Sequence, residues 1–162
     1  MTVLSSLVRA LGTLTAAGVF TDTQTVVVGG KTYTTQTTLT NVDGNVFKGA
    51  DAAAGLQNLF DAINLTGTPG TQYAAAMTIN TLVRAKAVTA TTLVVEAKTG
   101  GTVGNLIAST ETQTNASWGA ATLASGAGSL STAISEIKEQ CQLNADVIQA
   151  LDAIDGSSTS DV

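Results

Sequence analysis

The strongest constraint in this sequence lies in residues 130–155, which contain neither proline nor glycine and read LSTAISEIKEQCQLNADVIQALDAID. Apolar side chains recur there in steps of four and three, the heptad pattern of a helix that packs lengthwise on another helix. A lone helix with such a stripe is marginal in water, so it must pack on its own domain or on copies of itself. The seam positions are Leu130, Ile134, Ile137, Cys141, Asn144, Ile148 and Leu151.

One feature favours packing between copies, as a homo-oligomer, and a second bears on the number of copies. Residues 124–129, ASGAGS, predict a flexible linker in front of the helix. Leu143, Val147 and Ile154 widen the apolar face toward the C-terminal end, and three helices bury a wide face better than two. Isoleucine at the first heptad position (a) with leucine at the fourth (d) is also a pattern of dimers. A homotrimer is therefore favoured, and a dimer stays open as the alternative. Asn144 would fix the register of such a coiled coil.

Residues 21–123 predict a small β-rich domain with one packed amphipathic helix, so the expected fold class is α+β. Threonine dominates residues 21–40 and favours strands. Gly29-Gly30 can supply the positive φ angles of a two-residue hairpin turn. Asp51 can cap a helix over residues 51–64, in which apolar residues line one face.

Further strands are expected along the second half of this domain. Residues 82–87 and 93–98 alternate well around a turn at Thr91-Thr92. Residues 99–105 predict a glycine loop, and residues 106–111 and 117–123 are candidates for two more strands. Residues 156–162 are expected to form a flexible tail after the final helix.

The N-terminal segment, residues 1–20, predicts a short amphipathic helix that ends near Gly12. Its two candidate roles are packing on its own domain and serving as an arm that docks on a neighbouring subunit. The segment lacks a basic start and its apolar run is broken up, so we expect no export signal. The residues at helical spacing are Val3, Leu4, Leu7, Val8 and Leu11.

The composition argues against several classes of function. Histidine is absent, which removes the commonest general base and transition-metal ligand. Cys141 is alone, so no disulfide within the chain and no cysteine zinc site is expected. The net charge is −5 with scattered basic residues, which disfavours a nucleic-acid partner. No stretch is long and apolar enough to suggest a membrane partner.

No catalytic, metal or cofactor site is expected, and the chain is not expected to be an enzyme. The Gly29-Gly30 turn leads into a strand, whereas a phosphate-binding loop must lead into a helix. The turn at residues 41–45 lacks most calcium ligands. Glu136, Glu139, Asp146 and Asp152 read as a solvated helix face, with no neighbouring base to tune them. The expected cofactor is therefore none.

Aromatic residues are few, and only Trp118 and Tyr33 are candidates for a sugar-binding platform. Both are expected in the core instead, because so few aromatic side chains are present to fill the interior. A carbohydrate-binding module remains as an alternative function on this ground.

Four segments together resemble a small module that recurs in virion proteins of tailed bacteriophages. They read VVVGGKTYTTQTTLTNVDGNVFKGADAAAGLQNLFDAIN, GTQYAAA, ATTLVVEAKTGGTVGNLIASTET and ASWGAATLASGAG, and they lie within residues 26–128. Ala124-Ser125-Gly126 stands where the module usually ends in two glycines. The resemblance implies a structural phage protein, made in the host cytoplasm, with no catalytic residue. The module occurs in several virion parts, so capsid and tail both stay open.

The flanking segments favour the capsid. A short arm, a compact body and a self-associating helix are the layout of an oligomer that stands on a lattice. We therefore expect a viral capsid decoration (cement) protein or a short head fibre on the capsid exterior, bound to the major capsid protein or another virion protein. A tail, neck or fibre-adaptor component is the alternative.

Overall fold

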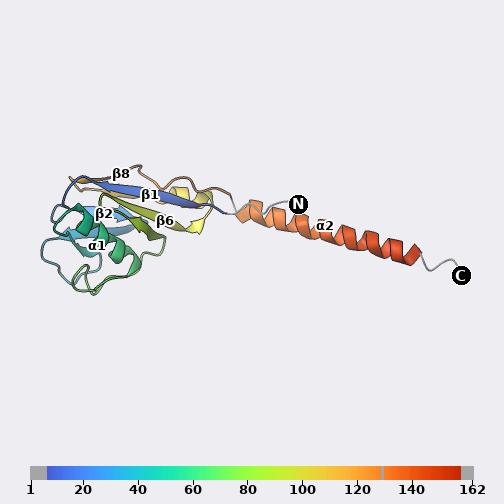
Figure 1. Cartoon of the computed structure of the whole chain (residues 1–162), viewed down its shortest axis with the longest axis horizontal. Helices are drawn as coiled ribbons and strands as arrows, with labels where there is room; N and C mark the ends of the chain where they lie inside the picture. The colour runs from blue at the N-terminus through green and yellow to red at the C-terminus, as the bar shows by residue number, and fades with distance from the viewer. Residues whose placement is uncertain (1–6, 129, 158–162) are drawn as a thin grey trace.

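The computed structural model describes residues 7–128 and 130–157. A compact α+β body is followed by a long helix that points away from it (Figure 1). The elements, in chain order, are β1 Arg9–Ala16, β2 Thr25–Val28, β3 Lys31–Gln36, β4 Asn45–Phe47, α1 Ala52–Asn64, β5 Val83–Val88, β6 Thr92–Gly100, the 3-10 helix η1 Thr102–Leu106, β7 Ser109–Glu111, β8 Ala116–Trp118 and α2 Leu130–Ser157.

Two four-stranded sheets share one hydrophobic core with α1. Their strand orders are β5-β6-β1-β8 and β4-β3-β2-β7, and every pairing is antiparallel except that of β3 with β4. Leu14 and Leu93 from the first sheet, Val26 and Tyr33 from the second, and Leu56 from α1 are all fully buried in this core. The expected α+β class is thus confirmed.

The predicted hairpin is present as β2 and β3. Val28 lies opposite Lys31, and Gly29 and Gly30 between them have φ angles of 60° and 75°. Positive φ at both central residues defines the type I′ turn, whose twist matches that of the strands it joins. The sequence therefore located this turn correctly.

The predicted central helix is α1. The Asp51 side chain accepts a hydrogen bond of 2.8 Å from the backbone N–H of Ala54, which satisfies one of the open donors at the helix start. Leu65 ends the helix in a left-handed conformation with φ of 55°. Leu56, Leu59 and Ile63 form the buried face of α1, so the amphipathic prediction for residues 51–64 is correct.

Strands β5 and β6 confirm the second predicted hairpin, and the outer edge of β5 is occupied by a side chain of α1. The amide of Asn64 donates to the carbonyl oxygen of Ala85 at 3.0 Å and accepts from its N–H at 2.9 Å. These two bonds copy the pairing that a further strand would make. The edge of β5 is therefore blocked at its middle.

The predicted N-terminal helix is wrong over Arg9–Gly12, because these residues belong to strand β1. Ala10, Leu14 and Ala16 are buried, and β1 pairs with β6 on one side and β8 on the other. Apolar residues spaced for a helix over so few positions also suit a strand, and pairing with two distant strands decides between them. Residues 1–6 lie outside the described part of the chain.

The segment expected to be a flexible linker is instead bonded to the body as far as residue 128. Ala124 and Ala127 form isolated bridges to Leu11 and Val8. The glycine loop expected at residues 99–105 is the end of β6 followed by η1, and β7 and β8 are shorter than the expected strands at 106–111 and 117–123. The expected turn at Thr91-Thr92 is shifted, because β6 already begins at Thr92.

Gly55 provides a test of how tightly α1 packs. A β-carbon at this position would lie 2.6 Å from the carbonyl oxygen of Lys48 and 3.0 Å from the ring of Phe20. Alanine usually stabilises a helix by about 1 kcal/mol over glycine, but Gly55→Ala should lower the free energy of unfolding by about 1–3 kcal/mol because the site is full. Urea unfolding followed by circular dichroism measures this difference.

The matched control is Gly119→Ala. Its added β-carbon meets only the carbonyl oxygen of Thr13, at an ordinary 3.7 Å, so the change in unfolding free energy should stay within about 0.5 kcal/mol. A Gly55→Ala variant as stable as the wild-type protein would contradict the tight approach of α1 to Phe20.

Candidate functional site

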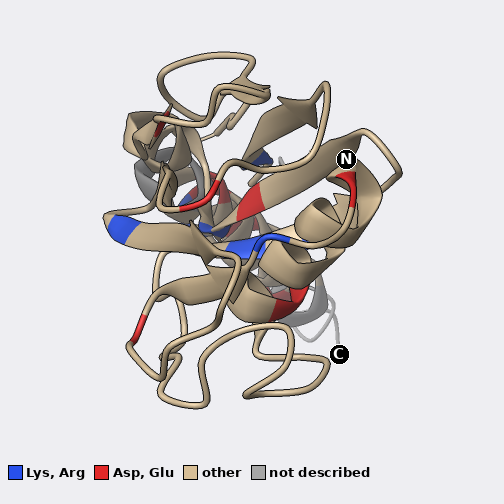
Figure 2. Ribbon diagram, turned by 90° about the vertical axis from the view of Figure 1, so that its left-hand side faces the viewer, with Lys and Arg blue, Asp and Glu red and all other residues tan. Residues whose placement is uncertain are grey.

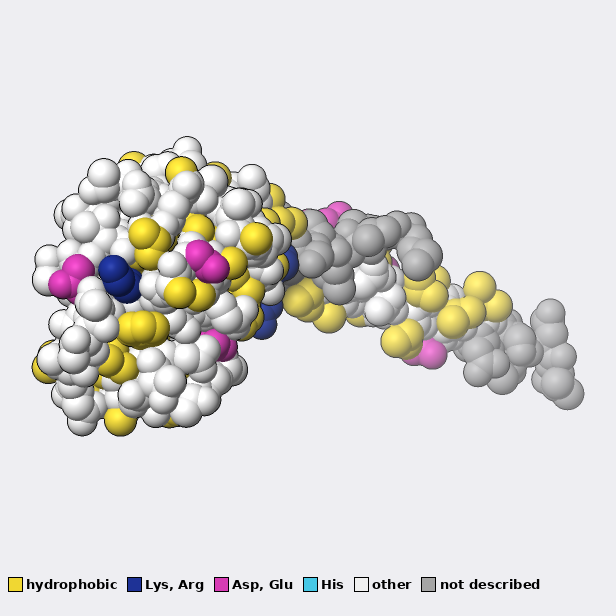
Figure 3. All heavy atoms as spheres, turned by 60° about the vertical axis from the view of Figure 1, so that its left-hand side comes forward, with side chains coloured by type: hydrophobic (Ala, Val, Ile, Leu, Met, Phe, Trp, Pro, Cys, Tyr) yellow, Lys and Arg dark blue, Asp and Glu magenta, His cyan; other side chains and the backbone are white. Residues whose placement is uncertain are grey.

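A long exposed apolar surface lies on α2. Every side chain described from residue 134 to residue 154 is exposed except that of Glu136, which is partly exposed. None of them is therefore buried against the body. Figure 3 shows hydrophobic side chains along the described part of this helix. The apolar side chains of this helix are thus largely exposed to solvent over residues 134–154.

The predicted seam lies on this uncovered surface. Ile134, Ile137, Ile148 and Leu151 are 44%, 50%, 58% and 60% exposed. Cys141 is also exposed. Because residues three and four apart share a helix face, these side chains form one stripe. Packing of this stripe on another helix stays a prediction.

Other residues widen or interrupt the stripe. Leu143, Val147 and Ile154 are also exposed, as the widened face requires. Asn144 is exposed and accepts a hydrogen bond of 3.2 Å from the side chain of Gln140. The side chain of Leu130 lies outside the described residues, although its backbone starts α2.

The root of α2 is fixed to the body by backbone hydrogen bonds. Val8 donates to Ala127 at 3.0 Å and accepts from it at 3.2 Å. Thr102 donates to the carbonyl oxygen of Gly128 at 3.0 Å. The side chain of Asn105 bonds both the N–H and the carbonyl of Gly126. The chain thus enters and leaves the body at one corner, beside η1.

The predicted docking arm is divided by the structure. Val3 and Leu4 lie outside the described residues. Leu7 is partly buried, Val8 is exposed at the bridge to Ala127, and Leu11 is half-buried within β1. The last three residues therefore help to build the body, and docking by the first six residues stays a prediction.

A second apolar surface, which the sequence analysis missed, lies at the same corner. We call it the end face and define it by Leu82, Val103 and Leu106, which are 48%, 64% and 80% exposed. They border a pocket of about 300 Å³ that also involves Gly29, Gly30, Thr99, Gly104, Ile107 and Ala108. Val103 and Leu106, three residues apart in a glycine-rich segment, were the available signal, but the sequence was interpreted there as a loop and a strand.

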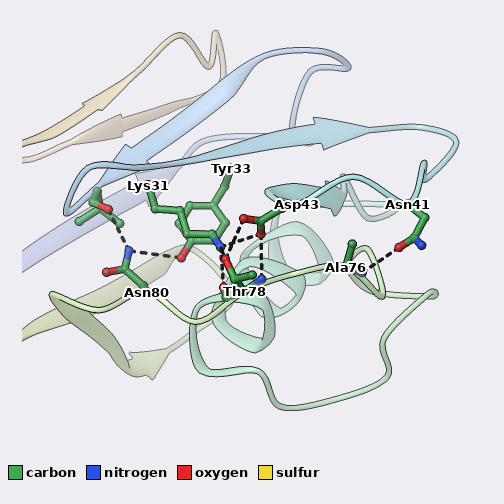
Figure 4. A network of polar contacts seen from close by, with 8 residues as sticks. Lys31, Tyr33, Asn41, Asp43, Ala76, Thr78 and Asn80 are labelled. Carbon is green, nitrogen blue, oxygen red and sulfur yellow. Dashed lines mark hydrogen bonds and ion pairs between the residues drawn. The ribbon is translucent and has the colours of Figure 1, made fainter.

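An ion pair between Lys31 and Asp43 is the centre of a polar network that joins separate segments of the body. Lys31 Nζ lies 2.7 Å from Asp43 Oδ1 and 2.7 Å from the hydroxyl of Thr78, whose N–H and hydroxyl in turn donate to Asp43 at 2.8 Å and 2.7 Å (Figure 4). The hydrogen bond from Lys31 lowers the pKa of Asp43 to about 2. These charges satisfy one another and join the β2–β3 turn to two neighbouring segments, so the network is a structural clamp.

The same clamp region contains one of the two aromatic residues considered as sugar platforms. Tyr33 is fully buried, and burial raises its pKa to about 12. Asn80 donates to the carbonyl oxygen of Val28 at 2.9 Å and lies 3.3 Å from the hydroxyl of Tyr33. Tyr33 cannot present its ring to a ligand in this position, so its predicted place in the core is confirmed.

The other candidate platform, Trp118, is partly buried and packs against the core. Its ring N–H donates to the carbonyl oxygen of Thr110 at 3.1 Å, which links β8 to β7 across the two sheets. The indole therefore lies at the edge of the core and not inside it as the sequence predicted, and it also lines a surface pocket with Ser109, Thr110 and Glu111.

A buried carboxylate on β6 is also paired internally. Glu96 accepts hydrogen bonds from Lys86 at 2.9 Å and from Arg84 at 2.8 Å. These bonds, that from Lys86 first, lower the pKa of Glu96. Glu96 lies on β6, and Arg84 and Lys86 lie on β5. The two positive charges offset the cost of burying the Glu96 carboxylate, so the group is an ion pair within the sheet.

No catalytic or metal centre emerges from these contacts. Among the described residues, no group of three or more His, Cys, Asp or Glu side chains could hold a metal ion. Within the same part of the chain, no helix has the length and apolar character needed to cross a membrane. Comparison with protein-family models, curated proteins and solved structures found no match.

The clamp predicts a specific pH dependence. Because the pKa of Asp43 is about 2 in the folded protein against an ordinary 3.8, its carboxylate contributes stability above about pH 4 that is lost as the pH falls to about 2. Asp43 is 47% exposed, so this contribution stays below about 1 kcal/mol. The stability difference between wild type and Asp43→Asn, measured by urea unfolding, should shrink over this range.

Glu96 titrates in both proteins, so the difference between them isolates Asp43. A difference that stays constant from about pH 5 to about pH 2 would contradict the role of the Lys31 hydrogen bond.

Proposed function

We propose that this chain is a structural protein of a tailed-bacteriophage virion that self-associates through α2 and decorates the capsid exterior, as a cement protein or short head fibre. The observation that carries the proposal is the uncovered apolar stripe of α2, held out from a compact body (Figure 1). The resemblance of residues 26–128 to the phage virion module supports the class of particle.

Self-association is the simplest way to cover α2. Its 28 residues give a helix about 40 Å long, and Ile134, Ile137, Ile148 and Leu151 are 44–60% exposed. A trimer covers the stripe together with Leu143, Val147 and Ile154, whereas a dimer leaves part of that wider face in water. A homotrimer is therefore the proposed state.

The body suits a structural role because, among the described residues, every buried side-chain nitrogen and oxygen has a hydrogen-bond partner. Charged side chains are few and dispersed over the body (Figure 2), and charged residues make up only 12% of the chain. Ionic contacts with a coat lattice are thus limited to a few at any single point. An oligomer that attaches through several bodies at once would turn weak contacts into stable attachment.

Copy number in the particle tests the proposal. Quantitative mass spectrometry of purified virions should find this chain in numbers comparable to the coat protein, because a decoration protein covers the lattice. A few copies per particle would instead assign it to the tail, neck or fibre adaptor. Absence from purified virions would remove the phage structural role altogether.

The double variant Ile134→Asp/Ile148→Asp tests the seam. Two carboxylates in each helix would have to be buried in the bundle, which costs several kcal/mol per subunit, so the oligomer should dissociate to monomers. Analytical ultracentrifugation measures the mass, and circular dichroism measures loss of α2 helicity.

The matched control is Gln142→Asp/Gln149→Asp, which adds the same charge on the opposite face of α2 and should leave the mass unchanged. A seam variant with the wild-type mass would show that α2 does not join the chains.

A further inference from the structure

The end face is built to present apolar side chains outward. Gly104 lies so close to the first sheet that a β-carbon there would be 2.9 Å and 3.0 Å from those of Ala10 and Ala97. One side of η1 is therefore pressed onto β1 and β6. In a 3-10 helix, residues three apart lie directly above one another, so Val103 and Leu106 share a side, and their high exposure places that side in solvent.

The surroundings of these side chains are apolar as well. None of the described residues that line the adjacent pocket carries a charge, and Thr99 is the one with a polar side chain. The N–H of Gly29 donates to the carbonyl oxygen of Ala108 at 3.1 Å, which fixes the hairpin turn beside the segment that follows η1. The pocket is thus part of the rigid body.

The end face adjoins the root of α2. Thr102, the first residue of η1, donates to Gly128, and Asn105 bonds Gly126 on both sides of its peptide unit. Only residue 129 separates this bonded segment from α2. Figure 1 shows η1, in yellow, at the end of the body from which α2 leaves. Any bundle of parallel α2 helices therefore brings several end faces close to its axis.

We infer that the end face is a contact between neighbouring copies of this chain, in which Val103 and Leu106 of one body pack on the end face of the next beneath the α2 bundle. This inference rests on the proposed self-association. The occupant is a second copy because η1 is bonded to Gly126 and Gly128, next to the start of α2 where the proposed bundle begins, and the described lining of the adjacent pocket has no charge to attract a different partner.

The composition of the seam gives a reason for this added contact. Cys141 and Asn144 occupy two adjacent middle layers, and a polar residue such as asparagine in a core layer lowers coiled-coil stability. A helix in a protein owes most of its stability to the packing of its apolar face. Burial of Val103 and Leu106 at the base of the bundle would supply apolar area that the middle of the seam does not.

Two variants of the full chain test the contact. Val103→Asp/Leu106→Asp changes only exposed side chains, so the body should keep its circular dichroism spectrum, while the dissociation constant of the oligomer should rise about tenfold or more. Leu106→Cys in a Cys141→Val background has one cysteine per chain, because Cys141 is the one cysteine of the sequence. It should crosslink between chains with a bismaleimide reagent, because the contact brings two copies of position 106 close together.

The control for crosslinking is Val19→Cys in the same background. Val19 is 38% exposed and lies beyond the far end of β1, about 25 Å from the bonded corner if eight residues of strand separate them. It should not crosslink between chains. Should the double aspartate variant lose its fold, crosslinking at Leu106 still decides the question.

The remaining outcomes separate this inference from the proposed function. An oligomer that the seam variant dissociates, but in which Leu106→Cys does not crosslink, retains the seam and overturns the end-face contact. A double aspartate variant that oligomerises normally but no longer attaches to purified capsids assigns the end face to the coat protein, which also overturns it. A wild-type protein that is monomeric at all concentrations overturns both.

Discussion

The backbone pairing between the start and the end of the body is the constraint on which the rest of this structure depends. Val8 and Leu11 in the first strand region exchange hydrogen bonds with Ala127 and Ala124. Because β1 also lies between β6 and β8, this pairing joins the exit of the chain to the middle of a sheet. Helix α2 therefore follows a folded segment that ends at residue 128, with one residue between that segment and the start of the helix.

The elements that depend on neighbouring residues in the sequence were the ones that could be predicted. The Gly29-Gly30 turn, the Asp51 cap and the apolar face of α1 each depend on neighbouring residues, and each was found where the sequence placed it. The long helix followed equally from an uninterrupted pattern. By contrast, β1 forms because distant strands pair with it, and no pattern within Val8–Leu11 carries that information. Residues 124–128 were misinterpreted for the same reason.

The two candidate surfaces also differ in whether the sequence alone could predict them. The α2 stripe could be predicted because its periodicity lies within one helix, whereas the end face combines η1 with Leu82 and the β2–β3 turn. Polar groups leave little else for recognition. In the described part of the chain, no buried side-chain nitrogen or oxygen lacks a hydrogen-bond partner. The buried polar side chains are therefore used within the fold, and the two candidate surfaces, α2 and the end face, consist mainly of apolar side chains.

The amide of Asn64 has a further consequence. It occupies both hydrogen-bonding groups of Ala85 on the outer edge of the first sheet. An open edge strand can recruit the same strand of another molecule, and the new edge can recruit again, which leads to fibres without a defined length. With this route closed at its middle, growth through that edge is blocked. An added strand could therefore not pair continuously along β5, because the helix that packs on this sheet also supplies the side chain that ends it.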